Sequence, residues 1–225
     1  MIVIEADNVT VTGFNITTGG GFITCTGNYR YCTGLYLREY NNSDISDNIF
    51  YNLERYSIIS LKSNRTKITN NVFRNPAVKG GCGIITDSSN NSIIDNNTFE
   101  DNPMYGIWMS FCKNNKIQNN FVTKSTFGII MWKAHDSLVF GNTFYKNKEK
   151  GICLKECTHN TIASNNFIRN LKSASFFHSS DNIWEGNYWN RPRLLSKRIF
   201  GRTGKDAFTP VINKDYHPLK MPYES

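Results

Sequence analysis

The sequence predicts an all-β fold, a parallel β-helix built as a solenoid of about eight rungs. Three observations predict it: a repeat of mostly 22 or 23 residues, apolar residues spaced two apart within each repeat, and an Asn at one fixed place in nearly every repeat. A period this short excludes helix–turn–helix repeats, and a spacing of two is that of strands. The 30 Asn among 225 residues also argue against a helical bundle, because Asn is a poor helix former.

Each repeat is built around an apolar anchor, followed three residues later by Asn and five residues later by a large apolar residue. The anchors are Val11, Ile45, Ile68, Ile94, Ile117, Val139, Ile162 and Trp184. The Asn column is Asn48, Asn71, Asn97, Asn120, Asn142, Asn165 and Asn187. We interpret this column as a structural ladder in which side-chain amides hydrogen-bond from rung to rung.

Two further apolar columns, ten and eight residues before each anchor, predict the inward side of a longer strand. The first of them is Met1, Leu35, Ile58, Ile84, Ile107, Ile129, Ile152 and Ala174. In the first repeat this register places Met1 and Val3 inward, and Ile2 and Ile4 outward. Leucine-rich repeats are the main alternative at this period, and they fit less well because Leu is sparse.

The repeats resemble those of a known family. Units such as NNSDISDNIFYN, NRTKITNNVFRN and NNSIIDNNTFEDN, followed by GIxM or GIxL, are similar to the repeats of the periplasmic copper-binding NosD family. They equally resemble carbohydrate-binding proteins and sugar hydrolases with β-helices. The resemblance covers residues 1–190 and implies a right-handed helix. It also implies a secreted, extracytoplasmic or cell-surface location.

The sequence shows neither a transferable catalytic motif nor a metal site. No His, Cys or Met cluster has ligand spacing, so we expect no metal and no cofactor, whatever the family's copper label. Met109 and Met131 share an inward column and are predicted to lie in the core. The N-terminus, MIVIEADNVTVTG, has no basic region followed by an apolar one, so no signal peptide is visible in it.

The deviations from the repeat divide the chain into a solenoid over residues 1–190 and a C-terminal cap over residues 191–225. Insertions at 17–33 and 74–82 precede the same strand of two rungs. Cys25 and Cys32 are able to close the first insertion as a disulfide in an oxidising compartment, with free thiols as the alternative. The first rung has no visible cap, which predicts self-association there or a longer parent protein.

The outward side of the long strand holds the predicted functional residues, because a contiguous apolar and aromatic outer face marks an interaction surface. The predicted substrate-binding residues are Tyr36, Arg38, Asp87, Trp108, Trp132 and Lys155. Aromatic faces stack against sugar rings, and the charged groups bind hydroxyls. Weaker candidates for acid–base catalysis are Glu39, Asp87, Lys133, Glu156 and His178.

Two functions fit this pattern. The first is an extracytoplasmic protein that binds a polysaccharide on the outward face and, if it is an enzyme, acts as a hydrolase, lyase or epimerase. The alternative is a non-catalytic, NosD-like scaffold or surface-structure protein that engages partner proteins. The net charge of +8 is concentrated in the cap, so we expect no nucleic-acid partner, and no apolar stretch is long enough to span a membrane.

Overall fold

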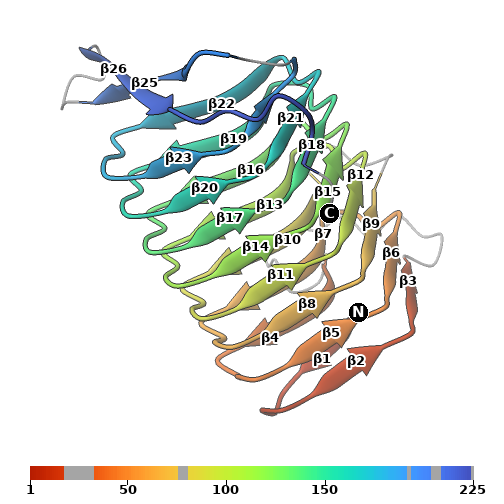
Figure 1. The fold of residues 1–225 in the computed structure, drawn as a ribbon. Helices are drawn as coiled ribbons and strands as arrows, with labels where there is room; N and C mark the ends of the chain where they lie inside the picture. Colours follow the sequence, from red (N-terminus) through yellow and green to blue (C-terminus); the bar gives the residue numbers. More distant parts are fainter. Residues whose placement is uncertain (18–32, 76–80, 192–193, 204–208, 224–225) are drawn as a thin grey trace.

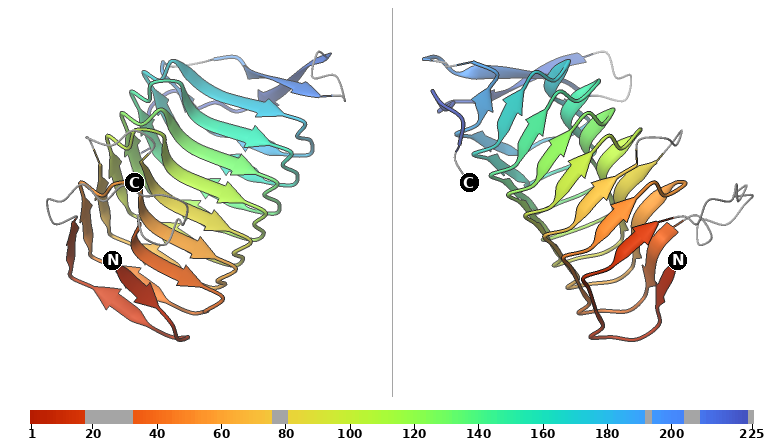
Figure 2. Two further views of the ribbon diagram at one scale, coloured as in Figure 1. Left: turned by 180° about the vertical axis from the view of Figure 1, so that it is seen from behind. Right: turned by 90° about the vertical axis from the view of Figure 1, so that its right-hand side faces the viewer.

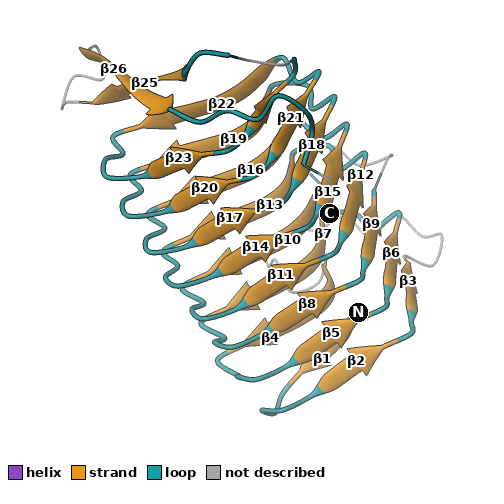
Figure 3. Cartoon of the chain, viewed as in Figure 1, coloured by secondary structure: helices purple, strands orange, loops and turns teal. Residues whose placement is uncertain are grey.

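The computed structural model describes residues 1–17, 33–75, 81–191, 194–203 and 209–223. These residues form strands and turns, with no helix among them, and so none long and apolar enough to cross a membrane (Figure 3). Most of the two predicted insertions, including Cys25 and Cys32, lies outside the described residues.

The strands stack into three faces that wind around one axis (Figures 1 and 2). The first face is β1 (Ile2–Ile4), β4 (Thr33–Arg38), β7 (Tyr56–Leu61), β10 (Cys82–Asp87), β13 (Tyr105–Ser110), β16 (Phe127–Trp132), β19 (Lys150–Lys155) and β22 (Lys172–Phe177). The second is β2 (Thr10–Thr12), β5 (Asp44–Ser46), β8 (Lys67–Thr69), β11 (Ile93–Asp95), β14 (Lys116–Gln118), β17 (Leu138–Phe140), β20 (Thr161–Ala163) and β23 (Ile183–Glu185). The third is β3 (Asn15–Thr17), β6 (Ile49–Tyr51), β9 (Val72–Arg74), β12 (Thr98–Glu100), β15 (Phe121–Thr123), β18 (Thr143–Tyr145), β21 (Asn166–Ile168) and β24 (Tyr188–Trp189).

Neighbouring strands within each face are parallel, which confirms the predicted right-handed parallel β-helix. The pairing joins equivalent residues of successive repeats, such as Ile84 with Ile107 and Ile94 with Ile117. Their side chains are fully or almost fully buried along the axis. The column five residues after the anchor packs ring on ring where it is aromatic, and the centroids of Phe73 and Phe99 lie 4.7 Å apart.

The first rung departs from the predicted register. Ile2 pairs with Leu35 and Ile4 pairs with Leu37, so Ile4 is buried (3% exposed) whereas Met1 is 58% exposed. The expectation that Met1 lies inward and Ile4 outward is therefore wrong. The cause is a turn that is one residue shorter, because Ile4 precedes Val11 by seven residues whereas Leu37 precedes its anchor by eight.

A ladder of buried Asn side chains runs along the corner between the second and third faces. In a typical step, the side-chain oxygen of Asn120 accepts hydrogen bonds from the backbone N–H and the Nδ2 of Asn97, at 3.0 Å each. The Nδ2 of Asn120 donates to the carbonyl oxygen of Ile94 on the preceding rung and to Oδ1 of Asn142 on the next, at 2.9 Å each. Each amide therefore bonds both along the stack and to the backbone.

The ladder ends on a carboxylate from the C-terminal segment. Strands β25 (Lys197–Thr203) and β26 (Thr209–Asp215) form an antiparallel hairpin that pairs with β22 and β23. Asp215 is fully buried, and its Oδ2 accepts hydrogen bonds from the backbone N–H of Asn187 (2.9 Å) and from Nε1 of Trp189 (2.9 Å). The Asp215 carboxylate thus takes the place that the next Asn of the ladder would occupy.

Removing one Asn side chain from the ladder should destabilise the protein. In Asn120→Leu the buried donors and acceptors that bond to the amide lose their partner, at a cost of about 1–3 kcal/mol for each unsatisfied group. Lys116→Leu, an exposed change on the same rung, should leave the free energy of unfolding almost unchanged. Thermal and urea melts compare the two variants, and equal stability of Asn120→Leu and the parent would contradict the role given to the ladder.

Substitutions at Asp215 separate its role as an acceptor from its size. Asp215→Leu leaves the Asn187 N–H groups and the Trp189 indole N–H without a partner, so the free energy of unfolding should fall by about 1–3 kcal/mol or more. Asp215→Asn keeps one acceptor oxygen and should lose less. Denaturant melts followed by tryptophan fluorescence measure both losses, and the opposite order would refute this account of the ladder's end.

Candidate functional site

The candidate site lies on the outer side of the first face, where alternate residues of each long strand point away from the core. The strand register brings the predicted residues into two groups. We call a lane the row of outward side chains at equivalent positions on successive strands. Trp108 follows Ile85 in one lane, and Trp132 lies between Ser110 and Lys155 in the next lane. Tyr36 and Arg38 lie on β4, three strands from Trp108, and belong to neither group.

The first group surrounds a surface pocket of about 300 Å³. Its walls come from three adjacent strands and are mostly apolar; they are Tyr56, Ile59, Leu61, Ile85, Asp87, Trp108 and Ser110. The Trp108 ring also packs against the Tyr105 ring in a T-shaped arrangement, with 5.1 Å between centroids. The Trp108 indole N–H is buried and has no hydrogen-bond partner within the described residues. The pocket thus combines an aromatic wall and one carboxylate.

The second group is the Trp132 cluster, formed by Phe111, Trp132, Lys133, Lys155 and Glu156. The ammonium groups of Lys133 and Lys155 lie 5.6 and 5.1 Å from the Trp132 ring, and the Phe111 ring is 5.2 Å away. Glu156 accepts a hydrogen bond from the Trp132 indole N–H (3.2 Å) and forms an ion pair with Lys133 (3.5 Å). The indole is therefore held at its edge and flanked by two cations.

The cluster stands at a turn with left-handed backbone. Phe111, Lys133 and Glu156 each follow the last residue of a long strand and have φ between 50° and 54°. Asn and Asp adopt this conformation readily, whereas a bulky residue such as Phe does so at a cost of roughly 1 kcal/mol or more. Turn geometry alone therefore does not account for Phe at position 111. The sequence predicted Lys133 and Glu156 as candidate site residues, but Phe111 was not among the predicted site residues, although an aromatic residue at a turn position was a signal for it.

The hydrogen bond from Trp132, together with the nearby Lys133, lowers the pKa of the Glu156 carboxyl. Glu156 is therefore an ionised acceptor at neutral pH rather than a proton donor. Of the five predicted catalytic residues, only Lys133 and Glu156 are in direct contact within the described part of the chain. Glu39 instead pairs with Arg38 (3.4 Å) and Lys62 (3.6 Å) on the second and third rungs.

Asp87 and His178, the other two candidates, also stand apart. An oxygen of the Asp87 carboxylate accepts a hydrogen bond from the Ser88 hydroxyl at 2.7 Å and faces the pocket around Trp108. His178 follows β22 and packs edge-on against Phe177, with centroids 3.9 Å apart. The described residues thus bring together an aromatic and charged surface, but not the five catalytic candidates.

Comparison with known proteins assigns the family. Residues 3–194 match the family described as periplasmic copper-binding protein (NosD). The chain belongs to the NosD family. No protein with a curated description matches this NosD-family chain.

Several solved structures share the fold of this NosD-family chain. The periplasmic alginate epimerase AlgG is 20% identical with a TM-score of 0.65, over 69% of this chain and 42% of its own. The AlgE6 A-module, a mannuronan C-5 epimerase of Azotobacter vinelandii, is 15% identical with a TM-score of 0.57, over 69% and 52%. DFA-IIIase from Arthrobacter chlorophenolicus A6 is 16% identical with a TM-score of 0.62, over 82% and 51%. The chain thus covers about half of each or less, and the likeness shows the fold.

The donor atoms of the described residues do not fit the copper named in the family description. None of their His, Cys, Asp and Glu side chains form a group of three or more able to hold a metal ion. Met109 and Met131 are fully buried in the core, and Nδ1 of His135 is hydrogen-bonded to the Thr158 hydroxyl at 2.8 Å. Burial raises the pKa of the Cys82 thiol to about 12, which disfavours the thiolate that binds metals.

Acid should release Trp132 from Glu156. Because the folded-state pKa of Glu156 is depressed, its stabilising contribution is full above the unfolded-state pKa and is lost as the pH falls through the folded-state value. We expect the Trp132 fluorescence, taken as the difference from Trp132→Phe, to change as the pH falls below about 4.3, the ordinary pKa of a Glu carboxyl. Glu156→Gln keeps an acceptor oxygen without a charge and should remove this transition, whereas an unchanged transition would show that another group causes it.

Proposed function

We propose that the outer side of the first face binds a polysaccharide across the rungs that carry Trp108 and Trp132. The observation that carries the proposal is the placement of two indoles on adjacent strands, β13 and β16, one in a pocket and one flanked by cations. Adjacent strands are roughly 4.8 Å apart, so one extended sugar chain contacts both groups. The solved structures of alginate and mannuronan epimerases on this fold support a sugar ligand.

The two groups have complementary roles in this proposal. The apolar wall of the Trp108 pocket stacks against the apolar side of a sugar ring. In the Trp132 cluster, Glu156 positions the indole, while Lys155 and Lys133 bind hydroxyl or carboxylate groups. The lysines suit an acidic as well as a neutral polysaccharide. Asp87 is the carboxylate that lines the pocket, and any processing step is assigned to it.

An extracytoplasmic location belongs to the same proposal, since the family is described as periplasmic and AlgG is a periplasmic enzyme. The alternative function is a scaffold that docks a partner protein on this face. The apolar residues Ile85 and Ile130, which lie on the strands on either side of Trp108 at the equivalent position, favour it. A sugar chain needs the indole rings of Trp108 and Trp132 as stacking surfaces. Substituting these two residues therefore distinguishes sugar binding from a scaffold role.

Affinity electrophoresis in gels containing alginate or neutral polysaccharides tests the proposal. Trp108→Ala and Trp132→Ala should each weaken retardation about threefold to tenfold, because each removes one stacking platform. Phe121→Ala, which removes an exposed aromatic ring on the third face, is the matched control and should have no effect. Retardation that survives both Trp substitutions, or that is absent in every polysaccharide tested, would count against sugar binding and favour the scaffold.

A further inference from the structure

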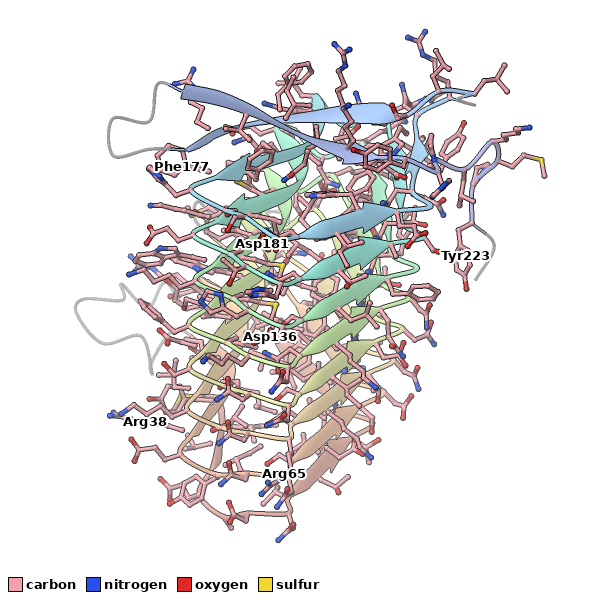
Figure 4. All side chains as sticks on the ribbon, turned by 60° about the vertical axis from the view of Figure 1, so that its left-hand side comes forward. Arg38, Arg65, Asp136, Phe177, Asp181 and Tyr223 are labelled. Carbon is pink, nitrogen blue, oxygen red and sulfur yellow. The ribbon has the colours of Figure 1, made fainter. Side chains whose placement is uncertain are left out.

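The C-terminal hairpin lies across the end of the stack and has an inner and an outer side (Figure 4). Ile199 is buried against the last rung, and Gly201 lies so close to Phe176 that a Cβ there would come within 2.4 Å of its ring. Because strand side chains alternate, Arg198, Phe200 and Arg202 point the other way. On β26 the same side carries Ile212 and Lys214.

This outer side is both apolar and basic. Phe200 and Ile212 are directly opposite each other in the hairpin, and their side chains are 52% and 43% exposed. Arg198 and Lys214 form the neighbouring opposite pair. Two like charges at directly opposite positions destabilise a strand pair unless an anion lies between or above them. Asp215, at the end of β26, is fully buried in the ladder and does not offset these charges.

The segment before the hairpin and the pocket beside β25 are also apolar and basic. Leu194 and Leu195 are 85% and 80% exposed, which is far from their usual place in a soluble domain. A pocket of about 390 Å³ beside β25 is lined by four cations, Lys172, Arg191, Lys197 and Arg198, and by no carboxylate among the described residues. Its size and charge suit an anionic headgroup.

We propose that this end of the solenoid docks onto the surface of an anionic phospholipid bilayer. Phe200, Ile212 and the two leucines enter the boundary between headgroups and acyl chains, while the cations contact lipid phosphates. Charge complementarity selects an anionic surface, and the exposed apolar side chains select one with an apolar layer beneath. A dissolved polyanion satisfies only the charges and leaves Phe200 and Leu194 in water. In this orientation the long axis of the β-helix points away from the bilayer, and the first face stays accessible to solvent.

Vesicle flotation tests the proposal with the full chain. The protein should float with vesicles of mixed phosphatidylcholine and phosphatidylglycerol, and not with pure phosphatidylcholine, and salt should weaken the binding. Removing cations in Arg198→Gln and Lys214→Gln should lower the partition coefficient about fivefold for each. Phe200→Ser should lower it about tenfold.

Matched controls lie on the other faces. Lys67→Gln and Lys116→Gln remove exposed cations from the second face, and Ile49→Ser removes an exposed apolar side chain from the third, so all three should bind vesicles like the parent. Trp108→Ala should also bind normally, which keeps this test independent of sugar binding. Equal losses in hairpin and control variants would overturn the proposal.

Two other outcomes would also overturn it. If no vesicle composition floats the protein while alginate binding depends on Arg198 and Lys214, the surface is a polyanion site. Sedimentation would show a dimer, and Phe200→Ser would dissociate it, if a second copy of the chain covers the hairpin. In that case the monomer would not bind vesicles. Thermal melts of each variant distinguish lost binding from lost fold, and the exposed positions of Arg198, Phe200 and Lys214 predict a stability no lower than that of the parent.

Discussion

The buried hydrogen bonds of the Asn ladder are the constraint on which the rest of the structure depends. A parallel β-helix turns its backbone sharply at three corners per rung, and each corner leaves polar groups facing the core. At the corner between the second and third faces, Asn97, Asn120 and their equivalents satisfy those groups with one side chain per rung and join each rung to the next. Because an unsatisfied buried amide is costly, the rungs stay in register along the whole stack.

A fixed register determines what the outer surface is able to present. Side chains at equivalent places on successive strands lie roughly 4.8 Å apart, so residues remote in sequence become neighbours in a lane. Trp132 and Lys155 meet in this way, and Glu156 reaches the indole from the next turn. The inward positions are held by packing, so the outward positions are free to carry function. Membership of the NosD family therefore predicts the β-helix fold better than it predicts a ligand.

The two proposed binding surfaces differ in their chemistry. The first face offers aromatic rings with a few charges beside them, which is the chemistry proposed to bind a sugar. The hairpin at the end of the stack offers exposed apolar side chains among exposed cations, which is the chemistry proposed to meet an anionic interface. Asp215 links this end to the interior, since the strand that carries Lys214 also terminates the Asn ladder.

The sequence by itself determined the solenoid, because strand alternation and the corner Asn both repeat with the rung and are visible as periods. It also predicted the columns of Trp108 and Trp132 on one outward side. Only the tertiary structure decided the features that do not repeat: the shortened first turn that buries Ile4, the bond from Trp132 to Glu156, and the closure of the ladder by Asp215. These depend on side-chain directions and on partners from other rungs, and a period carries no information about either.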